Sequence, residues 1–343
     1  MHAELTVTAA TPADRDDWQH YVSSAHDEAG YHDWGWRDVF KRAFDHDSIY
    51  LIARRDRVVT GVLPLVEIKS LLFGHTLTSL PFLNYGGVLA DDVPSGQALV
   101  AASRREAETR HCRHVELRHV SAQFPDLPCK QHKVSMRLPL APGMWEGLDR
   151  KVRNQVRKAE KSGLTVDRGG AELVDDFYAV FARNMRDLGT PVYSRRLFEE
   201  VCGVFPGRTT IHVVRFEGKP VAAGLTYRTT RMTQLPWASS IRDYNTLSPN
   251  TLLYWDAIQL ASEAGCAVFD MGRSTPNEGT FKFKQQWGAE PLALHWEYQL
   301  KSEQALPNVS PANPKFQLAI ALWQRLPLAL TLRVGPMIVR AIP

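Results

Sequence analysis

The feature that most constrains the fold of this 343-residue chain is an internal repeat. When the sequence is aligned with itself, residues 99–118 match residues 253–272, and this match places Glu116 on Asp270. In both segments, apolar residues spaced three and four apart indicate a helix, and a short β-rich run follows it. The same helix and strand are therefore predicted twice, at one constant offset along the chain.

A second match lies upstream in each half of the chain. Apolar residues alternate at 49–53 and 58–65, and again at 211–215 and 220–225, with a polar turn inside each pair of runs. Two alternating runs around a short polar turn are typical of a β-hairpin. Because hairpin, helix and strand recur in the same order, we expect one mixed α/β unit to occur twice.

The expected fold class is α/β with mixed α+β sheets, built as two tandem domains and a tail. A chain of this length is about twice the size of a typical domain. We place the first domain at residues 1–141, the second at 142–302 and a helical tail at 303–343. In this assignment a strand at 136–140 closes the first sheet, and a strand at 295–300 closes the second.

Composition narrows the class of protein. The net charge of +4 and the pI near 8.8 are too weakly basic to indicate nucleic-acid binding by themselves. The four cysteines follow no regular spacing, which favours free thiols in a reducing compartment. Histidines and cysteines at 111–132 match no common zinc pattern, so no metal is expected. The N-terminus lacks a basic and apolar leader, and a cytoplasmic location is expected.

A strongly charged helix is predicted at 145–162, ended by Gly163. Its basic side chains outnumber its acidic ones, and a narrow apolar stripe runs along it. Clustered positive charge suits the phosphates of tRNA, of a nucleotide sugar or of an anionic lipid. We select Arg153 and Arg157 as the residues for this contact. A solvated helix without a ligand is the alternative.

The order of the predicted elements resembles the GNAT acyltransferase fold, and the tandem arrangement resembles the FemAB family. As architecture, the resemblance covers residues 1–300, whereas the sharp motifs are confined to the second half. Within the family, the chain is most similar to a branch associated with exosortase (PEP-CTERM) and exopolysaccharide gene clusters. The motifs that carry the resemblance lie at residues 151–163, 184–193, 249–255, 269–274 and 280–288.

The resemblance implies an enzyme that transfers an acyl or aminoacyl group to an amine. Such a reaction needs an uncharged amine, a donor carbonyl held in line, and positive or hydrogen-bonding groups where the oxyanion develops. Lys284 follows Phe283 in a Phe-Lys-x-x-Trp-Gly motif, and the resemblance implies that this lysine stabilises the transferring group. An ordinary surface lysine is the alternative. Trp287 replaces the phenylalanine usual in the family, so a different pocket shape is expected.

Asp270, Arg273 and Ser274 lie at the end of a predicted central strand, where open α/β sheets bind ligands. We expect Arg273 to bind an anion, since a guanidinium suits phosphate and carboxylate, and we group Ser274 with it. Three roles are open to Asp270. The first role is to accept a proton from the amine, the second is to orient Arg273 or a backbone amide, and the third is to cap the local structure. The family resemblance weighs against an indispensable base.

Aromatic and hydroxyl side chains of the second half are candidates for a cleft that holds the acceptor. Rings and hydroxyls suit a glycan-bearing or peptide-bearing envelope precursor, and core packing is the alternative for each ring. The candidate substrate-binding residues of this kind are Tyr193, Trp237, Ser240, Tyr244, Asn250, Tyr254 and Phe283.

The donor stays open between aminoacyl-tRNA and an acyl thioester, and no tightly bound cofactor is expected. A CoA-dependent GNAT grips the pyrophosphate with a glycine-rich loop before a helix. The corresponding residues here, 248–252, contain no glycine, which disfavours acetyl-CoA. Two functions compete with an envelope transferase. One is an acyl-CoA-dependent N-acyltransferase, and the other is a non-catalytic scaffold of an exopolysaccharide system.

The tail is basic and apolar. It carries Arg325, Arg333 and Arg340, and it has no acidic residue after Glu303. Pro327 and the arginines interrupt it too often for a membrane-spanning helix, which needs about 20 mainly apolar residues. We expect either an interfacial helix at an anionic inner membrane, which would suit a lipid-linked acceptor, or packing onto a domain.

Overall fold

The chain forms two compact units, which are described separately. The computed structural model describes residues 4–25, 29–71, 73–301, 306–307 and 314–342. The first unit comprises Met1–Lys133, Ala293–Pro307 and Arg340–Pro343, and the second comprises Val134–Leu292 and Asn308–Val339. The tail expected at 303–343 lies in part outside the described residues.

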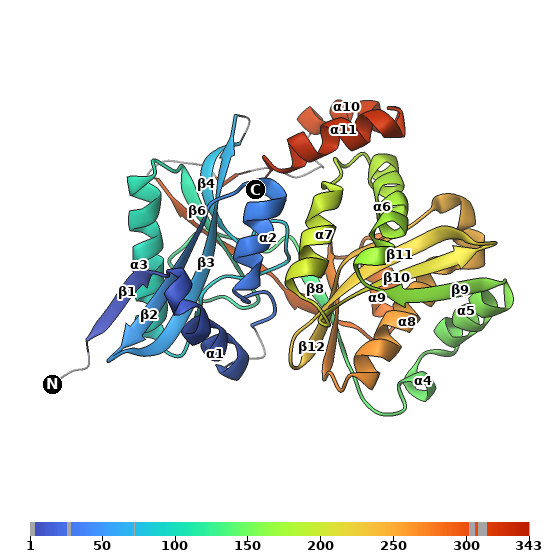
Figure 1. Cartoon of the computed structure of the whole chain (residues 1–343), viewed down its shortest axis with the longest axis horizontal. Coiled ribbons are helices and arrows are strands. Elements are labelled where there is room, and N and C mark those ends of the chain that lie inside the picture. The colour runs from blue at the N-terminus through green and yellow to red at the C-terminus, as the bar shows by residue number, and fades with distance from the viewer. Residues whose placement is uncertain (1–3, 26–28, 72, 302–305, 308–313, 343) are drawn as a thin grey trace. The chain divides into compact units, whose positions relative to one another are not determined.

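The first unit is built on one mixed sheet with the strand order β1-β2-β3-β4-β6-β15-β7, and β5 pairs with β3 (Figure 1). Strands β4 and β6 are parallel, and the other neighbours are antiparallel. The strands are β1 (Leu5–Ala9), β2 (Ser48–Arg55), β3 (Val58–Ser70), β4 (Gly74–Ser79), β5 (Leu89–Ala90), β6 (His114–His119), β7 (Cys129–Lys130) and β15 (His295–Leu300).

Helices cover both faces of this sheet because the side chains of its strands alternate. Leu51 of β2 belongs to a buried cluster with Leu99 of α3 (Val93–Thr109). Tyr50, the preceding residue, stacks on Trp18 of α1 (Arg15–Ala25) with 4.8 Å between ring centroids. The alternation that predicts the hairpin therefore supplies one core on each side of the sheet. The short helix η1 (Pro12–Asp14) precedes α1.

The second unit is built on a seven-stranded sheet with the order β14-β8-β13-β12-β11-β10-β9. Strands β12 and β13 are parallel within it. The strands are β8 (Val134–Pro139), β9 (Leu164–Gly169), β10 (Thr209–Phe216), β11 (Lys219–Arg228), β12 (Met232–Ser240), β13 (Val268–Ser274) and β14 (Glu290–Ala293). The helices are α4 (Met144–Gly147), α5 (Arg150–Lys161), η2 (Ala171–Leu173), α6 (Val174–Leu188), α7 (Arg195–Val204), η3 (Arg242–Leu247), α8 (Pro249–Glu263), α9 (Gly279–Gln285), α10 (Pro314–Trp323) and α11 (Leu328–Val339).

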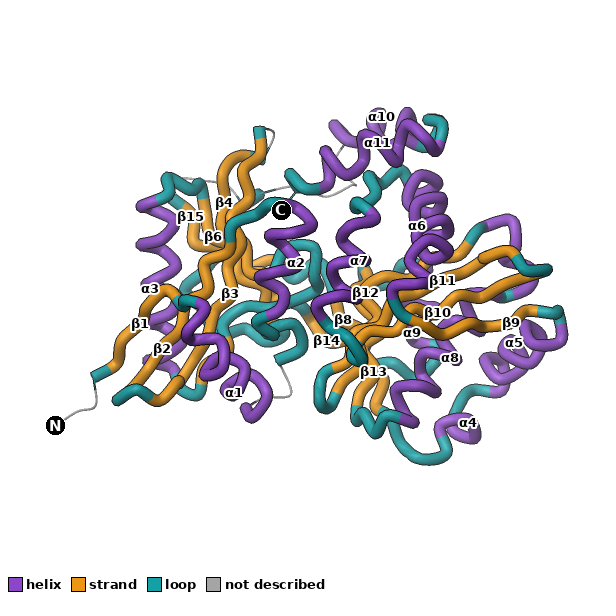
Figure 2. Tube along the Cα trace, in the orientation of Figure 1, coloured by secondary structure: helices purple, strands orange, loops and turns teal. Residues whose placement is uncertain are grey.

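Two helix layers enclose the second sheet, as Figure 2 shows. Helices α5 and α8 share one buried cluster, in which Val156 and Leu253 join Phe269 of β13. On the α6 and α7 side, the ring of Phe198 meets Trp237 of β12 edge to face, with centroids 5.4 Å apart. Apolar burial on both faces is the main source of stability for such a layered unit.

Two strands belong to the opposite sheet from the one expected. Strand β8, which overlaps the strand expected at 136–140, pairs antiparallel with β13 of the second unit rather than closing the first sheet. Strand β15, expected to close the second sheet, pairs with β6 of the first. Alternating apolar residues identify each segment as a strand, but alternation does not specify a partner. Each half of the sequence thus contributes a strand to the other unit.

The repeat appears in the strand register of the two units. In the first unit, residues 76–78 of β4 pair in parallel with 114–116 of β6. In the second, residues 232–234 of β12 pair in parallel with 268–270 of β13. Glu116 and Asp270, which coincide when the sequence is aligned with itself, therefore occupy the same position of the same parallel pair. The prediction of a mixed α/β unit present twice is confirmed.

Two helical segments differ from the sequence prediction. The helix expected at 145–162 is divided into α4 and α5, because Leu148 is extended and Asp149 caps α5 by accepting a hydrogen bond from Lys151 N at 2.6 Å. Helix α2 (Gly35–Phe44) was absent from the prediction, although its buried residues follow helical spacing. No helix among the described residues is long and apolar enough to cross a membrane.

Candidate active site

The two parallel strands of the second unit share only a short pairing and then continue toward their carboxyl ends. Residues 232–234 of β12 pair with residues 268–270 of β13. Beyond this pairing, β12 extends to Ser240 and β13 extends to Ser274. Past Asp270, β13 pairs with β8 after a register shift. Gly272 lies in this shift with φ 81°, a left-handed conformation that favours glycine. The carboxyl end of β13 therefore has the strand geometry at which open sheets bind ligands.

Lys284 brings a buried ammonium group to this strand end. The residue lies on α9 and is 6% exposed. Its Nζ donates hydrogen bonds to Gly272 O at 3.0 Å and to Arg273 O at 3.1 Å. An ammonium has three donors, and the described residues provide no third acceptor within hydrogen-bond distance. One N–H of a buried cation is thus left for a ligand, and the surface-lysine alternative is wrong.

The surroundings of Lys284 make its ammonium unusually acidic. Burial lowers the pKa of Lys284 to about 8, with a further lowering from the Arg273 charge and an opposing increase from Asp270. Desolvation disfavours a charged group, whereas a nearby carboxylate favours a cation. At neutral pH the side chain is therefore still mostly protonated, yet it holds its proton less tightly than an exposed lysine.

Asp270 holds in place the backbone of Gly272, to which Lys284 donates a hydrogen bond. Its side chain is fully buried, and Oδ1 accepts hydrogen bonds from Ser135 Oγ at 2.7 Å and from Gly272 N at 2.8 Å. Oδ2 lies 3.9 Å from Arg137 Nε. Of the three roles open to Asp270, this geometry favours orientation of a backbone amide. A general base must reach its proton, and a carboxylate enclosed in this way is poorly placed to do so.

Arg273 and Ser274 complete the strand end. The Arg273 side chain is exposed, and its charge acts on Lys284. The Ser274 hydroxyl is buried and has no hydrogen-bond partner among the residues that the structure describes. A buried hydroxyl usually has a partner, so an unpaired one invites a polar ligand atom. The structure thus places four of the residues selected from the sequence at this strand end, namely Lys284, Asp270, Arg273 and Ser274.

Phe283 and Tyr254 form the apolar support behind Lys284. Their rings meet edge to face with centroids 5.1 Å apart, and Phe283 also lies against Trp287 at 6.3 Å. Tyr254 is 6% exposed, and burial raises the pKa of its phenol. The contact between Phe283 and Tyr254 packs α9 against α8, and it agrees with the core role given as the alternative for Tyr254.

The remaining acceptor candidates lie on several elements of the second unit. Tyr193 stacks near Phe181 on the α6 side, with centroids 6.3 Å apart, and Trp237 packs in the same aromatic core. Ser240 ends β12, Tyr244 lies in η3 with its ring 6.0 Å from Phe216, and Asn250 opens α8. Core packing accounts for Trp237, which is buried, whereas Tyr193 is half-buried.

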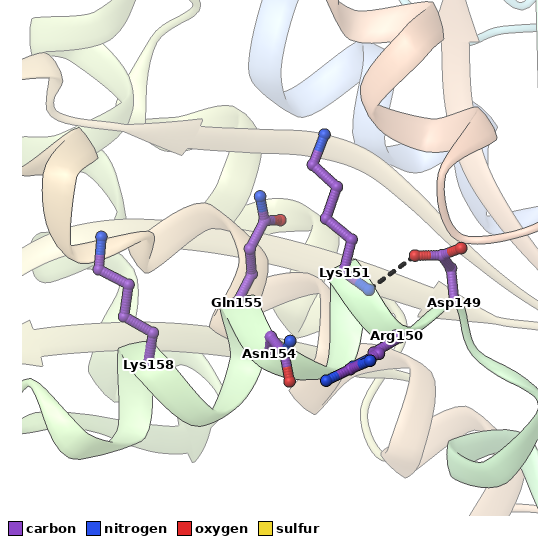
Figure 3. A pocket seen from close by; sticks show the side chains of 6 residues that line it. All are labelled: Asp149, Arg150, Lys151, Asn154, Gln155 and Lys158. Atoms are coloured by element: carbon purple, nitrogen blue, oxygen red, sulfur yellow. Dashed lines mark hydrogen bonds between the residues drawn. The ribbon is translucent and has the colours of Figure 1, made fainter.

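Helix α5 presents a basic surface. Figure 3 shows Lys151, Gln155 and Lys158 extending to the same side of the helix. They line a shallow surface hollow of about 510 Å³ together with Asp149, Arg150 and Asn154. Lys151 and Lys158 are not among the residues selected from the sequence, although they belong to the same charge cluster as Arg153 and Arg157.

The two arginines selected on α5 differ from each other. The Arg157 guanidinium lies over the Trp145 ring at 5.3 Å from the centroid, a cation–π contact. Arg153 is half-buried, and its Nε has no hydrogen-bond partner in the described part of the chain. Lys151 also lines a second hollow of about 530 Å³ with residues 285–288, directly after Lys284. Lys151 is thus the basic side chain that the two hollows share, and Asp149 lines both of them as well.

The first unit contains one group of potential metal ligands among its described residues. Glu67, His75 and Cys112 have ligand atoms within 4.8 Å of one another. Glu67 already pairs with His75 Nε2 at 2.6 Å, and Lys69 and Arg110 lie 3.4 and 3.7 Å from its other oxygen. Burial and the Glu67 charge raise the pKa of the Cys112 thiol to about 11. Glu67 therefore already has three partners among the side chains of the first unit.

The fold can be compared with known proteins. Residues 148–285 match the family model described as an acetyltransferase (GNAT) domain. The matched segment contains α5, the β12–β13 pair and Lys284. No curated protein sequence matches the chain.

Three solved structures show the same architecture. FemX is 13% identical with a TM-score of 0.65, over 92% of this chain and 100% of that chain. The C-terminal domain of a putative lysylphosphatidylglycerol synthetase from Agrobacterium fabrum is 13% identical with a TM-score of 0.58, over 91% and 95%. A tandem GNAT protein from the clavulanic acid biosynthesis pathway is 12% identical with a TM-score of 0.55, over 89% and 100%. The chain therefore has a tandem GNAT-like fold similar to that of FemX, with an acetyltransferase (GNAT) domain at residues 148–285.

Proposed function

We propose that the chain transfers an acyl or aminoacyl group to an amine of a cell-envelope or exopolysaccharide precursor, at the β13 end of the second unit. The observation that carries this proposal is the buried Lys284 ammonium with one unused N–H. A cation held in a dry site is the group that acyl transfer needs beside the developing oxyanion.

The chemical step is an aminolysis. The neutral amine attacks the donor carbonyl, a C–N bond forms, and the C–O bond of an ester or the C–S bond of a thioester breaks. The proton lost by nitrogen leaves with the oxygen or sulfur of the donor. Lys284 donates its free N–H to the carbonyl oxygen as negative charge develops there, and Asp270 holds the Gly272 backbone that positions Lys284.

The basic surface supports a polyanionic donor. Lys151 and Lys158 line the hollow on α5, and Lys151 also lines the hollow beside α9. Aminoacyl-tRNA carries clustered phosphates that suit such a surface. The α8 start lacks glycine and begins with Pro249, which removes a backbone donor from the place where a CoA pyrophosphate would bind. We therefore favour aminoacyl-tRNA over acyl-CoA as the donor.

The acceptor is proposed from the sequence resemblance. The FemAB-like motifs favour an envelope precursor, and the likeness to the exosortase-associated branch favours an exopolysaccharide. The fold is similar to that of FemX, with a TM-score of 0.65. This likeness of fold supports the choice of a FemAB-type reaction.

Mass spectrometry of surface polymer and its lipid-linked precursors tests this function. Cells that contain the protein are expected to carry an acyl or aminoacyl substituent that is missing from cells without it, and its mass identifies the transferred group. Identical polymers and precursors in the two cell types would count against catalysis and favour a scaffold. If transfer in cell extracts requires CoA and continues after ribonuclease treatment, the donor would be acyl-CoA rather than aminoacyl-tRNA.

A further inference from the structure

The second unit ends in two helices that leave an apolar face exposed. On α10, Leu318 is 71% and Leu322 is 55% exposed, and on α11, Leu330 is 43% and Met337 is 70% exposed. The other large exposed apolar side chains of the described chain are Val58, Leu71, Val93 and Leu188. Scattered apolar side chains need no explanation, whereas a gathering of them on adjacent helices indicates an interaction surface.

The opposite face of α11 is firmly packed, which fixes the orientation of the helix. Thr331, Gly335 and Val339 recur every four residues and are buried. Gly335 lies so close to Val192 that a Cβ added there would come within 2.9 Å of its backbone nitrogen. The exposed face of α11 is therefore held outward by close backbone packing.

Helix α10 is held in the same way. Ile320 lies against Gly189, leaving no room for a side chain there. Gln324, one turn later, donates from Nε2 to Asp187 O at 3.2 Å. Leu318 and Leu322 are one turn apart and are not on this packed side. Figure 1 shows α10 and α11 together beyond α6 of the same unit.

Positive charge accompanies each apolar stripe. Arg325 lies in the turn just after α10, and on α11 Arg333 lies between Leu330 and Met337 at i, i+3 and i+7. Both arginines are exposed. Residues 314–342 contain no acidic residue. The exposed face is thus apolar and cationic, without a compensating negative group.

We propose that the exposed face of α10 and α11 lies on an anionic lipid surface, with the leucines and Met337 at the acyl boundary and Arg325 and Arg333 at the headgroups. Neither helix can cross a membrane, so the helices lie in the plane of the interface. The charge favours anionic lipid over a second copy of the same basic face, since like charges repel. This inference does not depend on the transfer chemistry.

Vesicle sedimentation of the full chain tests the proposal. Vesicles of phosphatidylcholine with phosphatidylglycerol are expected to bind the protein, and vesicles of phosphatidylcholine alone to bind it far more weakly. The double variant Leu322→Glu, Met337→Glu should lose binding. Each of Arg325→Gln and Arg333→Gln should weaken it about fivefold. The matched control is Leu71→Glu, which alters an exposed leucine of the first unit and should bind normally.

Three outcomes overturn the proposal. One is equal binding by the double variant and the Leu71→Glu control. Another is binding that does not respond to phosphatidylglycerol. The third is a concentration-dependent dimer in size-exclusion chromatography that the double variant abolishes, which would assign the face to a protein interface. Because all the altered side chains are exposed, unchanged circular dichroism spectra are expected for every variant.

Discussion

Replacing Lys284 by methionine is expected to reduce transfer by at least about 100-fold, the usual consequence of removing one donor to a developing oxyanion. Methionine retains the length of the side chain and removes a buried charge, so the second unit should fold normally. The matched control is Lys282→Met, because Lys282 is an exposed lysine on the same helix. Its transfer should stay within about twofold of the unaltered protein.

The readout for these variants is the amount of the substituent on surface polymer, measured by mass spectrometry in cells that contain equal amounts of each protein. A Lys284→Met protein that is folded and supports full substitution would remove Lys284 from the chemistry. Equal losses in both variants would point to a general effect of positive charge on α9 instead.

Replacing Asp270 by alanine is expected to destabilise the strand end by about 3 kcal/mol, because it leaves buried donors of Ser135 and Gly272 without an acceptor. It also removes the carboxylate that favours the Lys284 ammonium. Hydrogen–deuterium exchange of β13 and α9 should therefore accelerate, and transfer should fall with it.

The conservative variant Asp270→Asn separates positioning from proton transfer. The asparagine carbonyl can still accept the hydrogen bonds from Ser135 and Gly272, so the slow exchange of β13 should be largely retained. Substantial transfer is then expected, whereas a general base would be lost with the carboxylate. Asp270→Asn with normal exchange protection but no transfer would restore Asp270 as the base.

The sequence predicts the repeat, most elements and the strand end of the site. Hairpin, helix and strand could be recognised because their periodicities are local, and Lys284 could be selected because its motif is local. Strand partners could not be predicted, since β8 and β15 have the alternation of any half-buried strand and pair with segments far away in the chain.

The surroundings of individual side chains are the second feature that could not be predicted from the sequence. A tyrosine or tryptophan suits a core as well as a cleft, and only packing shows that Tyr254 and Trp237 lie among other rings. The burial of Lys284 likewise depends on its contacts with Gly272 and Arg273 of β13, which belong to a different element from its own helix. Composition carries no sign of these contacts.

The central claim is that the second unit holds a desolvated ammonium at the end of β13, and NMR titration of the lysine side chains tests it most directly. With ¹³Cε-labelled lysine, one resonance is expected to titrate with a pKa of about 8, to vanish in Lys284→Met and to persist in Lys282→Met. A spectrum in which the Lys284 resonance titrates at the pKa of an exposed lysine, about 10.4, would contradict the claim.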